Sequence, residues 1–140
     1  MTEQHFEPYS KVSDEQRSKT LQELEEQDWE EPDFSSRLVR TCYALRRKPL
    51  RDFTVEDLRI MIGQNISLSY LMPLAIEQLQ RDPLVAGDFY PGDLLANVLK
   101  VESNFWQLHP HLRQAVQDIV DHLKPFPEDL HSALLVFQRD

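Results

Sequence analysis

The stretch Pro110-His-Leu-Arg-Gln-Ala-Val-Gln-Asp-Ile-Val-Asp-His-Leu123 decides the fold class, because its apolar residues recur with the period of an α-helix. Counted from the first of them, they fall at i, i+3, i+4, i+7, i+8 and i+11: Leu112, Ala115, Val116, Ile119, Val120 and Leu123. Pro110 suits the first turn of such a helix, where the amide hydrogen that proline lacks would be unpaired anyway. The stretch therefore predicts an amphipathic helix that buries one face.

Similar patterns predict helices elsewhere in the chain. Thr54 and Asp57 have the spacing of a capping box, the pair of side chains that begins a helix, and this helix is expected to end near Gly63. Residues 68–79 are apolar around most of a helical circumference, which predicts a helix at the centre of the core. The other segments expected to be helical are 13–27, 35–48, 94–99 and 128–137, with a short helical turn around 105–106.

The composition agrees with a helical protein. The 140 residues include three glycines and nine prolines, which suits helices ended by proline better than a sheet with glycine-rich hairpins. A chain of this length can bury one real core. We therefore predict an all-α fold, a compact single-domain bundle of about six to eight helices. Residues 1–12 are expected to form a flexible N-terminal segment and residues 13–140 the single helical domain.

Charge is distributed unevenly along the chain. The net charge is −9, with −8 in residues 1–34, +6 in residues 35–51 and −7 in residues 52–140. An acidic chain is repelled by phosphate backbones and anionic membranes, so neither nucleic acid nor a membrane is an expected partner. No apolar run approaches the roughly 18 residues of a membrane span, and the acidic start of the chain does not resemble a signal peptide. These features predict a cytoplasmic protein.

The basic block falls in the predicted helix 35–48, which Ser35 is expected to cap and Pro49 to stop. The residues expected to face inward are Leu38, Val39, Cys42 and Tyr43. The basic residues expected to face water are Arg40, Arg46, Arg47 and Lys48. Because a disulfide framework needs at least two cysteines, the lone Cys42 is expected to pack as a small hydrophobe, which again favours the cytoplasm.

No catalytic or cofactor-binding pattern in the sequence is convincing. The chain has no glycine-rich phosphate loop, and nothing marks Cys42 as an activated nucleophile. One rival hypothesis is a small metal-dependent hydrolase, because Asp118 and His122 lie four residues apart on one helix, a spacing that suits metal ligands. Its candidate ligands are His109, His111, Asp118 and His122. A solvated helix face explains these residues more simply, so we expect no enzyme, no metal and no cofactor.

Two segments are candidate surfaces for binding another protein. The first is the acidic run 23–33 with Trp29, since an exposed tryptophan among acids has the composition of an interface; the alternative is that Trp29 folds back into the core. The second is the turn 88–93, where Asp93 is expected to cap or charge the next helix while Phe89 and Tyr90 pack against the core. The candidate contact residues are Glu23, Glu25, Glu26, Asp28, Trp29, Glu30, Glu31, Asp33, Asp88, Tyr90 and Asp93.

Several segments carry a family resemblance when they are taken together. They are Thr20-Leu-Gln-Glu-Leu-Glu25 with Trp29, Lys48-Pro-Leu50, Phe53-Thr-Val-Glu-Asp-Leu-Arg-Ile-Met-Ile-Gly-Gln-Asn65, Tyr70-Leu-Met-Pro-Leu-Ala-Ile76 and Gly87-Asp-Phe-Tyr-Pro-Gly-Asp-Leu-Leu95. Through them the chain resembles, over residues 20–120, the immunity proteins of bacterial contact-dependent growth inhibition (CDI) systems. We interpret these stretches as marks of the fold, and we expect toxin specificity to lie on the exposed surface around them.

The resemblance implies a small cytoplasmic protein that binds and neutralises the C-terminal toxin domain of an exoprotein delivered by a neighbouring cell, as a 1:1 heterodimer. Such toxins are often nucleases, whose substrate grooves are basic, so an acidic inhibitor gains electrostatic steering and complementarity. The main alternative is an acidic cytoplasmic adaptor or regulator that sequesters a basic nucleic-acid-binding protein. Gene neighbourhood distinguishes the two.

Overall fold

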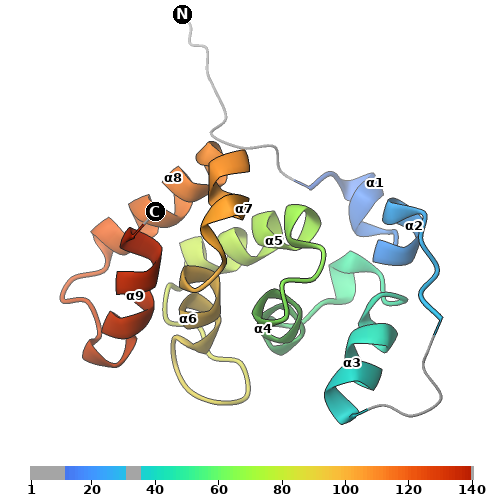
Figure 1. Cartoon of the computed structure of the whole chain (residues 1–140), viewed down its shortest axis with the longest axis horizontal. Helices are drawn as coiled ribbons and strands as arrows, with labels where there is room; N and C mark the ends of the chain where they lie inside the picture. The colour runs from blue at the N-terminus through green and yellow to red at the C-terminus, as the bar shows by residue number, and fades with distance from the viewer. Residues whose placement is uncertain (1–11, 31–35, 140) are drawn as a thin grey trace, which may run out of the picture.

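The structure, a computed structural model, describes residues 12–30 and 36–139, which form nine α-helices and no strand (Figure 1). This confirms the all-α prediction. The α-helices are α1 (Asp14–Arg17), α2 (Leu21–Glu25), α3 (Arg37–Leu45), α4 (Val55–Gly63), α5 (Leu68–Arg81), α6 (Asp93–Leu99), α7 (Ser103–Leu108), α8 (Pro110–His122) and α9 (His131–Gln138). Two short 3-10 helices, η1 (Leu50–Asp52) and η2 (Glu128–Leu130), precede α4 and α9. In the described part of the chain, no helix is long and apolar enough to cross a membrane.

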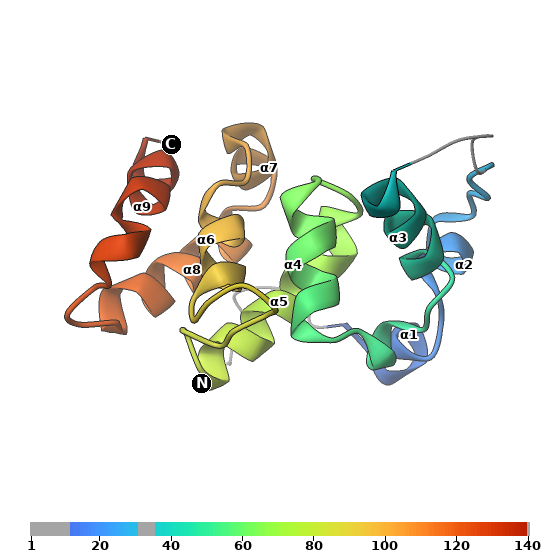
Figure 2. The ribbon, with the colours of Figure 1, turned by 90° about the horizontal axis from the view of Figure 1, so that it is seen from below.

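Helix α5 lies at the centre of the core, as the apolar pattern of residues 68–79 predicts. Its buried residues are Leu71, Met72, Pro73, Leu74, Ala75, Ile76 and Leu79. Helices α4, α6 and α8 pack against it, and α1–α3 and α9 lie at opposite ends of the molecule (Figure 2). Helix α8 buries five residues of the predicted stripe, namely Leu112, Ala115, Val116, Ile119 and Val120, and the sixth, Leu123, is partly buried just after the helix. The helical period therefore identified both buried faces correctly.

The single helix expected over residues 13–27 is wrong, because this segment forms two short helices. Each has its own capping box, Ser13 with Gln16 in α1 and Thr20 with Glu23 in α2. The side chain of Thr20 accepts the backbone N–H of Glu23 at 3.1 Å, which begins a new helix within the expected one. Two capping signals seven residues apart are thus the reason for the break.

Helix α3 also differs from expectation in detail. Its N-cap is Ser36, whose hydroxyl accepts the N–H of Val39 at 3.1 Å; Ser35, the expected cap, lies outside the described residues. Cys42 is buried as predicted, whereas Leu38 is exposed. Helix α3 therefore buries a narrower face than its sequence pattern indicates.

Candidate functional site

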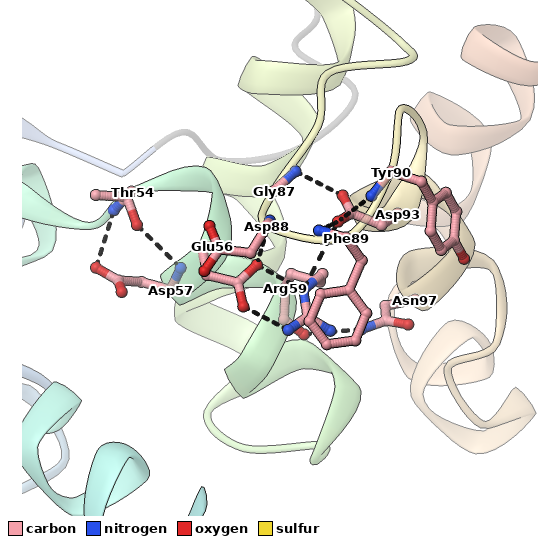
Figure 3. A network of polar contacts seen from close by, with 10 residues as sticks. All are labelled: Thr54, Glu56, Asp57, Arg59, Gly87, Asp88, Phe89, Tyr90, Asp93 and Asn97. Atoms are coloured by element: carbon pink, nitrogen blue, oxygen red, sulfur yellow. Dashed lines mark hydrogen bonds and ion pairs between the residues drawn. The ribbon is translucent and has the colours of Figure 1, made fainter.

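The turn 87–93 is held from inside by the carboxylate of Asp93, the first residue of α6 (Figure 3). Asp93 is only 2 % exposed. Its side chain accepts backbone N–H groups from Gly87 at 2.7 Å, Phe89 at 3.0 Å and Tyr90 at 3.3 Å. Asp93 was expected to cap or charge the start of α6; its position there is confirmed, but its carboxylate points back to the turn that precedes the helix.

A second carboxylate, that of Glu56 on α4, completes the support of the turn. It accepts the N–H of Asp88 at 2.8 Å and is paired through both oxygens with the guanidinium of Arg59, one helical turn further on. Arg59 Nε also lies 3.9 Å from Asp93 Oδ2. The side chain of Asn97 on α6 donates to the carbonyl of Arg59 at 2.9 Å. The turn, α4 and α6 are therefore joined by one polar network.

The charges in this network stabilise one another. Hydrogen bonds from Arg59 lower the pKa of Glu56, against a smaller opposing effect of burial. Burial opposes ionisation of Asp93, but the three backbone N–H donors and the nearby Arg59 outweigh it, so its pKa is also lowered. Both carboxylates are therefore ionised at neutral pH.

The aromatic residues of the turn point outward, which contradicts the expectation that they pack against the core. Phe89 is 70 % exposed and Tyr90 is 44 % exposed. The guanidinium of Arg59 lies 4.1 Å from the centroid of the Phe89 ring, so it supports one face of that ring. The buried carboxylate of Asp93 holds the turn in place of aromatic packing, which leaves both rings available at the surface.

The acidic segment is attached to the basic helix α3 through Arg46, which is 1 % exposed. The prediction that Arg46 faces water is wrong, because its guanidinium pairs with Glu25 and donates to the carbonyl of Gln27 at 2.9 Å. It also lies 4.2 Å from the centroid of the Trp29 ring, which in turn makes an edge contact with Tyr43. Trp29 is thus half-buried on this arginine, between the two alternatives that the sequence left open.

The candidate contact residues therefore fall into two separate groups. Glu23, Glu26, Asp28 and Glu30 are exposed beside α2, whereas Glu31 and Asp33 lie outside the described residues. Helices α3 and α4 lie between this group and the turn that carries Asp88, Tyr90 and Asp93 (Figure 2). Sequence reasoning missed Glu56, Arg59 and Asn97. Only the three-residue spacing of Glu56 and Arg59 hinted at their pairing, and nothing local connected them to a turn 32 residues away.

Replacing Glu25 with alanine is expected to lower the free energy of unfolding by about 1–3 kcal/mol, because it leaves the buried charge of Arg46 without its carboxylate. The expected loss is below that of a fully buried pair because the side chain of Glu25 is 23 % exposed. Urea denaturation measures the change. Glu26→Ala, at the exposed neighbouring position, is the matched control and is expected to change stability by less than about 0.5 kcal/mol. Equal losses in the two variants would contradict the role given to the Glu25–Arg46 pair.

The residues of the hydrolase hypothesis have other contacts. His109 stacks on Phe105, and Nδ1 of His122 lies 2.7 Å from the carbonyl oxygen of Asp118. The carboxylate of Asp118 accepts from Gln114 at 2.9 Å. The described residues contain no group of three or more histidine, cysteine, aspartate or glutamate side chains that could hold a metal ion.

Burial raises the pKa of Cys42, which keeps its thiol protonated and fits a packing role.

The described residues thus define a helical protein with a turn that carboxylates hold from inside and that directs two aromatic rings outward. The family model for CDI immunity proteins matches residues 23–116, which is more than half of the chain and includes the described acids 23–30 and the whole turn. The chain belongs to this family, as the resemblance in its sequence implied. None of the curated proteins matches it.

Proposed function

We propose that this protein binds the C-terminal toxin domain of a CDI exoprotein in the cytoplasm, as a 1:1 complex, and thereby protects the cell that makes it. The observation that carries the proposal is the family match over residues 23–116. The exposed acids beside α2 and the aromatic turn support it as two surfaces suited to a protein partner. On this proposal the protein acts by binding and catalyses no reaction.

The charge of the chain supports a nuclease as the toxin. A nuclease must present a basic groove to its substrate, and this chain carries a net charge of −9. The exposed acids Glu26, Asp28 and Glu30 lie within three residues of the half-buried Trp29 in the sequence, so an apolar side chain and negative charges occur in the same segment. Attraction between a basic toxin and this acidic surface would accelerate their encounter and favour the cognate orientation.

The direct test is to mix the purified protein with the toxin domain encoded immediately upstream of its gene. Size-exclusion chromatography and calorimetry are expected to show a stable complex with one copy of each chain. Absence of a complex between two folded proteins would contradict the proposal, and a complex of another stoichiometry would contradict its 1:1 form.

Neutralising the exposed acids beside α2 is expected to slow association with the toxin domain. The triple variant Glu26→Gln, Asp28→Asn, Glu30→Gln removes three negative charges without touching the Glu25–Arg46 pair, so a fall of about 3–10-fold in the association rate is expected at low salt. Stopped-flow measurements over a range of salt concentrations test this, because screening should make the difference disappear at high ionic strength.

The matched control for this variant is Asp121→Asn, Glu128→Gln, Asp129→Asn. It removes the same charge from exposed positions on α8 and η2, at the opposite end of the molecule (Figure 1). Its association rate is expected to change much less. If both triple variants slow association equally, net charge and not the surface beside α2 controls the encounter.

A further inference from the structure

Carboxylates hold the backbone of the turn 87–93, whose aromatic side chains lie outside the core. Four consecutive backbone N–H groups, those of residues 87 to 90, are all accepted by carboxylates. Asp93 accepts three of them and Glu56 accepts the fourth. Gly92 closes the turn with φ 91°, a conformation that suits glycine, and donates to the carbonyl of Leu84 at 3.0 Å. The backbone of the turn is therefore held in one conformation before any partner arrives.

The side chain that this rigid backbone presents is Phe89. At 70 % exposure its ring contributes almost nothing to the core. Arg59 lies against one face of the ring and is itself fixed by Glu56, so the ring has a supported inner face and an open outer side. A large aromatic ring held in place in this way loses little conformational entropy when a partner covers it, which is the property of interface anchors.

The charge around Phe89 indicates which kind of surface would cover it. Three acidic side chains, those of Glu56, Asp88 and Asp93, and one guanidinium, that of Arg59, belong to this turn and its support. The excess is negative, so a cationic rim on the partner is favoured over an acidic one. An arginine or lysine of the partner would also be attracted to the exposed faces of Phe89 and Tyr90.

From these observations we propose that Phe89 is the anchor through which this protein grips its toxin domain, with the ring inserted into an apolar hollow bordered by arginine or lysine. This inference rests on the proposed function and names its central contact. Tyr90 flanks the anchor, while Glu56, Arg59 and Asp93 act as positioning residues that never touch the partner. Phe89 lies within a stretch interpreted from sequence as a mark of the fold, and its exposure adds a binding role to that stretch.

The test compares the affinities of wild-type protein, Phe89→Ala and Leu135→Ala for the purified toxin domain by calorimetry. Leu135 is the matched control, because it is another large apolar side chain, 59 % exposed, and lies on α9 instead of the turn. Phe89→Ala is expected to raise Kd by about 30-fold or more, the effect of a hot-spot residue, with an unchanged Tm. Leu135→Ala is expected to change Kd less than about threefold, and Phe89→Tyr is expected to retain most of the affinity because it keeps the ring.

The positioning role of Asp93 is tested by measuring how rigid the backbone of the turn is when this carboxylate is replaced. In Asp93→Asn, amide hydrogen exchange at residues 87, 89 and 90 is expected to accelerate, and the Kd for the toxin domain is expected to rise although Phe89 is intact.

Tight binding of the toxin domain by both wild type and Phe89→Ala would overturn this inference and leave the proposed function standing. Absence of binding by the wild-type protein would overturn both.

Discussion

Replacing Asp93 with alanine is expected to lower the free energy of unfolding by about 2–4 kcal/mol, a large effect for one residue next to a surface turn. The variant removes the acceptor of three backbone N–H groups and one of the two carboxylates that pair with Arg59 in the described part of the chain. Water can reach part of the opened turn, which keeps the loss below that of a deep core site. Urea denaturation followed by circular dichroism measures the change.

Asp88→Ala is the control for this variant. Asp88 is an exposed aspartate on the same turn, and its backbone N–H, which any residue but proline keeps, donates its hydrogen bond in the network. Its substitution is expected to change stability by less than about 0.5 kcal/mol. If Asp93→Ala is as stable as Asp88→Ala, the turn is held by something other than the buried carboxylate.

The same network predicts how stability depends on pH. Because the pKa values of Asp93 and Glu56 are lowered in the folded state, the unfolded chain binds more protons at acid pH. Their contribution is fully present above the ordinary carboxyl pKa of about 4, and it is lost as pH falls through the lower folded-state values. The double variant Glu56→Gln, Asp93→Asn is therefore expected to show a smaller loss of stability between about pH 5 and pH 2 than the wild type, when unfolding free energies are measured across that range.

Phe137→Ala is expected to lower the free energy of unfolding by about 3–5 kcal/mol, the usual cost of a cavity left by a buried aromatic ring. Phe137 on α9 is fully buried, and its ring packs edge-on against Trp106 with centroids 5.5 Å apart. The guanidinium of Arg113 lies 4.6 Å from the same ring. Helix α9 also packs on α6, whose first residue holds the turn.

The stability of Phe137→Ala is informative because α9 lies beyond the residues that the family model matches. A large loss would show that residues 131–138 are an integral part of the core that supports the turn. Leu135→Ala on the same helix is the control, with an exposed side chain and an expected change below about 0.5 kcal/mol. A loss near zero in Phe137→Ala would show that α9 is dispensable for the fold of the matched region.

Local signals in the sequence were sufficient for most of the helices. The apolar period of residues 112–123 predicted the buried face of α8, and the capping pair Thr54 and Asp57 is present at the start of α4. The expected helix 13–27 failed for a local reason that was visible in principle, because Thr20 and Glu23 form a second capping box.

The details of the candidate site depended on contacts that no local pattern contains. A charged helix residue usually faces solvent, which is why Arg46 was expected to be exposed. Its burial depends on Glu25, Gln27 and Trp29, which belong to another segment of the chain. Phe89 looked like a core residue because it is aromatic. Its side chain can stay exposed because the carboxylates of Asp93 and Glu56 accept the backbone N–H groups of the turn and hold it without aromatic packing.

The most direct test of the central proposal is the growth of cells that express the adjacent toxin domain from an inducible promoter, with and without this protein. We expect the toxin alone to stop growth, co-expression of the wild-type chain to restore it, and Phe89→Ala to restore it only when expressed in excess. Arrested growth despite abundant folded wild-type protein would contradict the assignment of this chain as the immunity partner of that toxin.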